Sequence, residues 1–206
     1  MTNLAAEEAG VEESAVDGRT ARRDRNRDLV LDAVIALFTG GELAPNAAEV
    51  AERSGVSLRS VYRYFEDQDA LVRAAIARHA ELVAPLHQVP DLGVGPFDER
   101  VHRFVACRIR LYEAAAPTAR ATLLRAPTNR YLRDEMTRAR EALRVQAEAM
   151  FEPELAAMTA AERRAAAAAL DTVLQFESAE HLRVRLGLTA AQTADVLRRT
   201  LTALLT

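Results

Sequence analysis

The chain has 206 residues, half of them apolar and 28% charged, a composition typical of a globular protein with one large or two small domains. The single cysteine, Cys107, excludes an intramolecular disulfide, and no signal peptide or apolar run of about 18 residues is present, so a cytoplasmic protein without a membrane partner is expected. The net charge of −3 argues against nucleic-acid binding only until its distribution along the chain is considered.

The N-terminal segment separates the two signs of charge. Residues 1–18 carry acidic side chains, no basic one and few large apolar ones, so they are predicted to be a disordered acidic tail. A run of arginines follows directly: Arg19, Arg22, Arg23, Arg25 and Arg27. A basic segment just ahead of a DNA-reading unit is a typical electrostatic footprint, and the alternative is the solvated start of a helix.

Four helices are expected in the N-terminal part of the chain. An apolar stripe at helical spacing predicts the first over about 21–39, and Gly40 and Gly41 end it. The second is expected from the N-cap Asn46 to Ser54, the third from after Ser57 to Tyr64, and the fourth from after the N-cap Asp67 to about Ala84.

A loop rich in proline and glycine is expected at 85–96, followed by five more helices. Their predicted ranges are 97–115, 118–125, 128–151, 160–186 and 190–205. Capping-box patterns at Thr159 with Glu162 and at Thr189 with Gln192 fix the last two starts. The prediction is an all-α fold of about nine helices. Its parts are the tail 1–18, a DNA-binding domain 19–66 and a ligand-binding and dimerisation domain 67–206.

Residues 46–65 have the pattern of a helix-turn-helix. Ala51 is small enough for a close helix crossing, Gly55 can take the left-handed conformation of the turn, and Val61 supplies an apolar anchor. Ser57 would cap the next helix and leave its outer face free for a major groove. The pattern is moderately specific, because helix pairs in unrelated folds can imitate it.

A longer stretch, residues 27–75, resembles the N-terminal domain of the TetR family of transcriptional regulators. The resemblance lies in the Leu37-Phe38 pair, the turn from Glu49 to Ser57, and Val61-Tyr62-Arg63-Tyr64-Phe65 followed by an acidic cap and Leu71. The remaining helices and the total length fit that family's C-terminal domain loosely. The resemblance implies a homodimer that binds a palindromic double-stranded DNA operator, senses a small-molecule effector and acts by default as a repressor.

Arg59, in the exposed first turn of the expected recognition helix, is the first candidate for contact with a base edge, with guanine the expected partner. The resemblance makes Tyr62 a phosphate contact, and Arg63 one turn on could reach a phosphate or a base. The full set of DNA-binding candidates is Asn46, Ala47, Ser57, Leu58, Arg59, Ser60, Tyr62, Arg63, Tyr64 and Gln68.

Gln68 is a departure from the family's pattern, which usually has a lysine there. Glu66, Asp67 and Asp69 flank it, so backbone binding at this point should be weaker than usual. The arginine segment at 19–27 is the proposed compensation.

Two groups of residues are predicted to act in the C-terminal part. The ligand-pocket candidates are Phe104, Arg108, Tyr112, Tyr131 and Phe176. The alternative reading of Arg108, favoured slightly, is a structural ion pair with a later helix, for instance with Glu177. The dimer-interface candidates on the last two helices are Leu174, His181, Leu182, Leu197 and Leu201.

No enzymatic activity, cofactor or metal is expected. The sequence contains no Glu-x-x-His pair of the di-iron kind, no glycine-rich phosphate loop and no nucleophile elbow. The alternative function is a helical protein-interaction module of the same fold that has lost DNA binding, which Gln68 and its acidic neighbours favour.

Overall fold

In the computed structural model, the backbone is described from Leu4 to Thr206 and the side chains from Thr20 onward. Ten α-helices and two short turns of other helix types make up the regular structure of this part of the chain, and it contains no strand. The predicted all-α class is therefore confirmed. The chain divides into two compact units, Met1–Arg78 and His79–Thr206.

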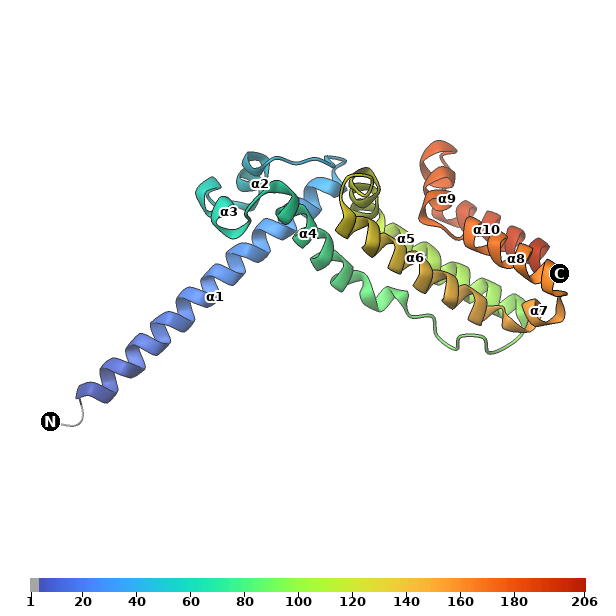
Figure 1. Cartoon of the computed structure of the whole chain (residues 1–206), viewed down its shortest axis with the longest axis horizontal. Helices are drawn as coiled ribbons and strands as arrows, with labels where there is room; N and C mark the ends of the chain where they lie inside the picture. The colour runs from blue at the N-terminus through green and yellow to red at the C-terminus, as the bar shows by residue number, and fades with distance from the viewer. Residues whose placement is uncertain (1–3) are drawn as a thin grey trace. The chain divides into compact units, whose positions relative to one another are not determined.

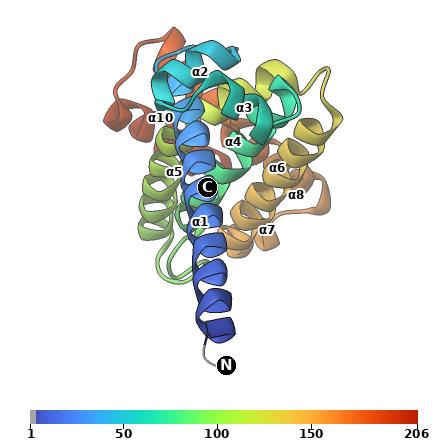
Figure 2. The ribbon, with the colours of Figure 1, turned by 90° about the vertical axis from the view of Figure 1, so that its left-hand side faces the viewer.

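The first unit contains α1 (Leu4–Thr39), α2 (Ala47–Ser54), α3 (Leu58–Tyr64) and most of α4 (Gln68–Val83). Most of the predicted apolar stripe of α1 is buried where α2 and α3 pack on it, but Leu29 is 49% exposed. Its core residues are Val30, Leu31, Ala33, Val34 and Phe38. Figures 1 and 2 show α1 continuing toward the N-terminus beyond the part that α2 and α3 cover.

The helix α1 begins at Leu4, well before the predicted start at 21, so its backbone runs through the segment for which disorder is predicted. The side chains of that segment, including Arg19, lie outside the described residues. The disordered acidic tail stays a prediction.

The first unit extends to Arg78, further than the predicted limit of 66 for the DNA-binding domain. The first half of α4 belongs to this unit because Leu71, Val72 and Ala75 are buried in its core. The Arg78 guanidinium also pairs with Asp28 and Asp32, which fastens α4 to α1. Neither contact is visible in local sequence.

The second unit starts with the end of α4 and the 3-10 turn η1 (Ala84–His87). After the loop follow α5 (Phe97–Arg125), α6 (Arg130–Met150), α7 (Glu152–Ala157) and α8 (Ala160–Val173). The last elements are α9 (Phe176–Glu180), the π-helical turn η2 (His181–Arg185) and α10 (Ala190–Leu205). Figure 1 shows α5 beside α6, and α8 beside α10.

The predicted helix ranges are wrong at two places. Pro117 lies inside the continuous α5 and does not separate helices at 97–115 and 118–125. Tyr112 before it and Thr118 and Ala121 after it are all buried, so packing outweighs the lost backbone hydrogen bond.

The predicted helix 160–186 is interrupted after Val173, where Leu174 and Gln175 leave the helical path. Side chains take over at the break: the Ser178 hydroxyl donates to the Thr172 carbonyl, and the Tyr112 hydroxyl donates to the Leu174 carbonyl. The predicted capping boxes at Thr159 and Thr189 are both present.

The core of the second unit brings together α5, α6, α7, α8 and α10. Phe104 packs edge-on against Phe151, with ring centroids 5.4 Å apart. Around this pair lie Val101, Met150, Leu155, Leu170, Leu197 and Leu201, all buried. This single apolar cluster fixes the relative placement of the helices of the unit.

A buried ion pair lies at the edge of that core. The guanidinium of Arg100, 3% exposed, binds the Glu154 carboxylate through both terminal nitrogens and also donates to the Met150 and Gly95 carbonyls. Arg100 thereby joins α5 to the junction of α6 and α7 and to the loop before α5. Arg100 was not among the residues predicted from the sequence.

Candidate nucleic-acid interface

The turn between α2 and α3 has the geometry that a helix-turn-helix requires. Asn46 caps α2 by accepting from the N–H groups of Ala48 and Glu49, and the Glu49 carboxylate accepts from the Asn46 N–H. Gly55 ends α2 with φ of 68°, a left-handed conformation in which a Cβ would be strained. Ser57 then caps α3 by accepting from the Ser60 N–H.

Apolar anchors hold α3 in place from beneath. Val50 on α2, Val56 in the turn, Val61 on α3 and Phe65 after it are all buried. Arg27 of α1 adds a cation–π contact, with its guanidinium carbon 5.4 Å from the centre of the Phe65 ring. One face of α3 is therefore committed to the core, and the other is free.

The free face of α3 carries the residues predicted to read DNA. Leu58, Arg59, Tyr62 and Arg63 are all exposed, and Tyr62 is exposed by 63% despite its large aromatic ring. An exposed tyrosine between two exposed arginines combines a phenol donor with two cations on one helix face. Such a surface can meet phosphate oxygens and base edges in a major groove.

Three further candidates on or beside α3 have structural contacts of their own. Tyr64 is half-buried, and the Arg63 guanidinium lies over its ring at 5.2 Å and donates to its hydroxyl. Ser57 and Ser60 are hydrogen-bonded to each other at the helix start. These contacts pre-orient Arg63 and the first turn of α3.

At the start of α2, the helix cap occupies groups of the segment that was predicted to contact DNA through Asn46 and Ala47. The N–H groups of Ala48 and Glu49 are already donated to the Asn46 side chain, and the Glu49 carboxylate lies at the same helix end. Ala47, half-buried, is the remaining position at this end. Asn46 therefore serves first as a cap.

Gln68 has a role that its place in the sequence did not suggest. Its side-chain amide donates to the Pro45 carbonyl at 2.8 Å, tying the start of α4 to the residue before the α2 cap. Asp67 caps α4 by accepting from the Ala70 N–H, as predicted. The amide thus stabilises the segment that presents α2.

The ligand-pocket candidates are only partly brought together. Phe104, Arg108 and Tyr112 lie along the buried face of α5, with the Arg108 guanidinium 4.6 Å from the Phe104 ring centre. Phe176 is half-buried at the start of α9. Tyr131, however, is 47% exposed at the start of α6, so it does not belong to a buried pocket wall.

The suggested ion pair between Arg108 and Glu177 is wrong. Glu177 pairs instead with Arg140 of α6, and Arg108 donates to the Leu143 carbonyl. Burial lowers the pKa of Arg108, which is 1% exposed.

Tyr112 is held in its neutral form by its surroundings. Burial raises its pKa to about 12, and its hydroxyl donates to the Leu174 carbonyl where α8 ends. A neutral, buried hydroxyl thereby satisfies a carbonyl that the interrupted helix leaves without its usual partner.

This raised pKa predicts a loss of stability in alkaline solution. The stabilisation is complete below the unfolded-state pKa of about 10 and is lost as the pH rises to about 12, because only the unfolded state ionises readily in that window. The expected loss is on the order of 2–3 kcal/mol. Urea unfolding at successive pH values measures it, and Tyr112→Phe, which cannot ionise, should remove this part of the pH dependence. An identical pH profile for both proteins would contradict the assignment.

Three of the residues predicted to lie in the dimer interface are buried within the protomer instead. Leu174, Leu197 and Leu201 all lie in the protomer's own core, so their side chains are not available to a second copy. Leu182 is half-buried against the same core, and His181 is exposed in η2. The amphipathic faces were recognised correctly as apolar, but sequence alone did not show which partner covers them.

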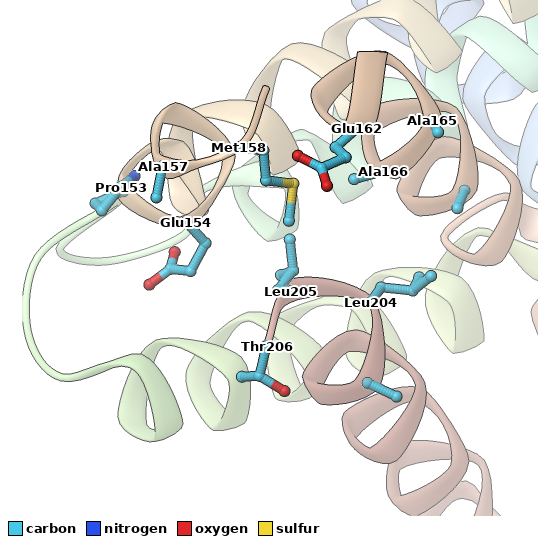
Figure 3. Close-up of a pocket in the computed structure, with 12 residues that line it drawn as sticks. Pro153, Glu154, Ala157, Met158, Glu162, Ala165, Ala166, Leu204, Leu205 and Thr206 are labelled. Atoms are coloured by element: carbon cyan, nitrogen blue, oxygen red, sulfur yellow. The ribbon is translucent and has the colours of Figure 1, made fainter. Parts of the chain in front are cut away.

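A groove opens on the outer side of α7, α8 and α10. Its volume is about 860 Å³, and small or apolar side chains dominate its walls. Figure 3 shows the side chains of Met158 and Leu205 turned toward each other across it. The other lining residues are Pro153, Glu154, Ala157, Glu162, Ala165, Ala166, Ala169, Ala203, Leu204 and Thr206.

The described residues contain neither a membrane-spanning helix nor a cluster of metal ligands. No helix from Leu4 onward is both long and apolar enough to cross a membrane. Within the same range, no group of three or more His, Cys, Asp and Glu side chains is arranged to hold a metal ion.

Comparison with known proteins shows that the fold of this chain is shared with a solved structure. No family model and no curated protein matches the chain. The structure is similar to a crystal structure from Pseudomonas aeruginosa PAO1, of a protein provisionally named a transcriptional regulator, with a TM-score of 0.63 and 17% identity over 88% of this chain and 90% of that one. At this identity, the shared feature is the all-helical fold over nearly the whole length of both chains.

Proposed function

We propose that this protein is a DNA-binding transcriptional regulator and that α3 is its recognition helix. The observation that carries the proposal is the exposed face of Arg59, Tyr62 and Arg63 on a short helix whose opposite face is anchored by Val61 and Phe65. Arginines on the exposed face of an anchored helix suit direct base readout. The similarity of fold to a provisionally named regulator and the resemblance of residues 27–75 to the TetR family support it.

The regulator acts as a homodimer in this proposal. A pair of recognition helices one DNA turn apart needs a two-fold axis, and the operator is then palindromic. The open groove between α8 and α10, lined by Ala165, Ala169 and Leu204, offers the surface for close helix packing between two copies. This groove replaces the buried leucines as the proposed interface.

The resemblance to the TetR family makes the regulator a repressor that a small-molecule effector releases from its operator. Such a protein works in the cytoplasm, without a cofactor and without enzymatic activity. The second unit, with its buried polar groups between α5 and α6, is the proposed effector-binding part.

The alternative is a protein-interaction module of the same fold without DNA binding. Carboxylates near α3 favour it: Glu49 lies at the start of α2, and Glu66, Asp67 and Asp69 surround the start of α4. Gln68, where the TetR family usually has a cation, is engaged with Pro45. Repulsion from phosphates at these points would weaken the grip on the DNA backbone.

Genome-wide mapping of bound DNA, followed by a mobility-shift assay on the recovered fragments, separates the two functions. The regulator should enrich a small set of sites with an inverted repeat, and the purified protein should shift those fragments in preference to unrelated DNA. The absence of any shift at low salt would favour the interaction module.

The arginine segment of α1 is expected to contribute backbone affinity. Arg22, Arg23 and Arg25 are exposed, whereas Arg27 contacts Phe65 and is best left unchanged. The triple replacement of the first three by glutamine should weaken binding at all sequences alike. It should also flatten the plot of log affinity against log salt by about 0.9 for each lost phosphate contact. A salt titration with an unchanged slope would rule the contribution out.

A further inference from the structure

Arg108 is a buried cation that forms no ion pair with any of the described residues. Its guanidinium donates from Nη2 to the Leu143 carbonyl at 2.8 Å and lies over the Phe104 ring, but Nε is buried without a hydrogen-bond partner. None of the ion pairs among the described residues includes it. Burying a charge in this way is costly unless a partner binds it.

Gln146 presents an unsatisfied atom of the opposite kind. Its Nε2 donates to the His87 carbonyl at 2.7 Å, which holds η1 against α6, and its Oε1 is buried without a partner. A buried amide oxygen without a donor is rare in a folded protein and calls for an explanation. Gln146 thus has a buried acceptor atom without a donor, and Arg108 has a buried donor atom without an acceptor.

The two groups belong to one cluster in the second unit. Leu143, whose carbonyl accepts from Arg108, lies one helical turn before Gln146 on α6. His87, which Gln146 holds, is close enough to Arg108 for the guanidinium charge to lower its pKa, after the larger effect of burial. Three elements, η1, α5 and α6, thus converge on these side chains.

We propose that Arg108 and Gln146 together bind a small carboxylic acid that carries a hydrogen-bond donor beside its carboxylate, as a 2-hydroxy acid does. The carboxylate accepts from Arg108 Nε, and the adjacent hydroxyl donates to Gln146 Oε1. A single ligand then satisfies both atoms with a charge-assisted and a neutral hydrogen bond. Phe104, under the guanidinium, supplies the apolar wall.

Calling this acid an effector rests on the proposed regulator function. The binding itself follows from the second unit alone. Because Arg108 and the two unsatisfied atoms are buried, the acid has to be small.

Thermal unfolding of the full-length protein, without DNA, tests the site with sodium lactate as the probe. Sodium chloride at equal ionic strength, sodium acetate and propane-1,2-diol serve as comparisons: acetate lacks the hydroxyl and the diol lacks the carboxylate. The variants are Arg108→Met and Gln146→Met, with Arg110→Met as the matched control because Arg110 is an exposed arginine of the same helix.

Lactate should raise the unfolding midpoint of the wild type and of Arg110→Met in a saturable way, more than acetate does, and the diol should not. Arg108→Met should weaken the lactate dissociation constant by about tenfold or more. Gln146→Met should erase the advantage of lactate over acetate, which keeps the test decisive if Arg108→Met fails to fold.

The proposal is overturned if lactate stabilises the wild type no more than sodium chloride, or if the two variants respond as the wild type does. Neither result bears on DNA binding, which the mapping and mobility-shift assays measure separately. Conversely, a protein that binds lactate at Arg108 but no DNA would refute the regulator and leave the acid site in place.

Discussion

Replacing Glu154 by alanine is expected to lower the free energy of unfolding by about 3–5 kcal/mol. The carboxylate holds the buried guanidinium of Arg100 through both terminal nitrogens, and its removal leaves a charge in the interior with only the carbonyls of Gly95 and Met150 as partners. Urea unfolding measures the loss.

A double variant separates the effect of the ion pair's charges from the effect of the space that its side chains fill. Arg100→Met with Glu154→Leu removes both charges, so it should recover much of the stability that Glu154→Ala alone loses. If Glu154→Ala were as stable as the wild type, the ion pair would carry no weight in the fold. The double variant also tells whether the pair stabilises the unit or chiefly fixes the junction of α6 and α7.

Leu201→Ala should cost about 2–5 kcal/mol of unfolding free energy, because Leu201 is 0% exposed and alanine leaves a cavity. The side chain lies in the apolar cluster of the second unit, so the loss of unfolding free energy arises within one protomer. Leu204, three residues later on the same helix, packs against the same core but also lines the open groove. The two leucines therefore compare a fully buried core position with one that also faces the proposed interface.

The matched variant Leu204→Ala should have a smaller effect on unfolding and a larger one on self-association. Urea unfolding at equal protein concentration and sedimentation of each variant measure the two effects. A folded but monomeric Leu201→Ala, as stable as the wild type, would return Leu201 to the dimer interface.

Local patterns were sufficient for the helix-turn-helix and for most helix starts. Gly55, Ser57, Asp67, Thr159 and Thr189 all act where the sequence places them, because caps and left-handed turns depend on a few neighbouring residues. The same locality explains why Arg59 and Arg63 could be assigned to the exposed face of α3 from their positions in the helix, whereas Tyr62 was assigned from the family resemblance.

Contacts between distant segments were not predictable in this way. An apolar stripe shows that Leu197 and Leu201 are covered, but not whether α5 or a second copy covers them. In the sequence, Pro117 indicates a helix end, because the packing of the residues on both sides of it cannot be predicted from the sequence. Gln146 and His87 gave no signal, since their relation to Arg108 depends on η1 and α6 meeting α5.

Arg100 did leave a signal that was not used. It follows Phe97 by three residues and precedes Phe104 by four, so it shares their buried helix face. A charged residue at such a position predicts a partner elsewhere in the core. Arg108 occupies the same face one turn after Phe104. The structure shows in addition that no carboxylate of the described residues pairs with it.

Whether α3 reads DNA is tested most directly by one titration. Fluorescence anisotropy with a mapped operator fragment and with a shuffled fragment is measured at one fixed salt concentration for the wild type, Arg59→Ala and Arg130→Ala. Arg130 is a suitable control because its side chain is 91% exposed on α6, in the other unit. The wild type and Arg130→Ala should prefer the operator.

Arg59→Ala should weaken operator binding by about 1–3 kcal/mol, roughly 5- to 150-fold, with a smaller change on shuffled DNA. Equal binding of the wild type to both fragments, or unchanged operator affinity in Arg59→Ala, would contradict the assignment of α3 as the recognition helix.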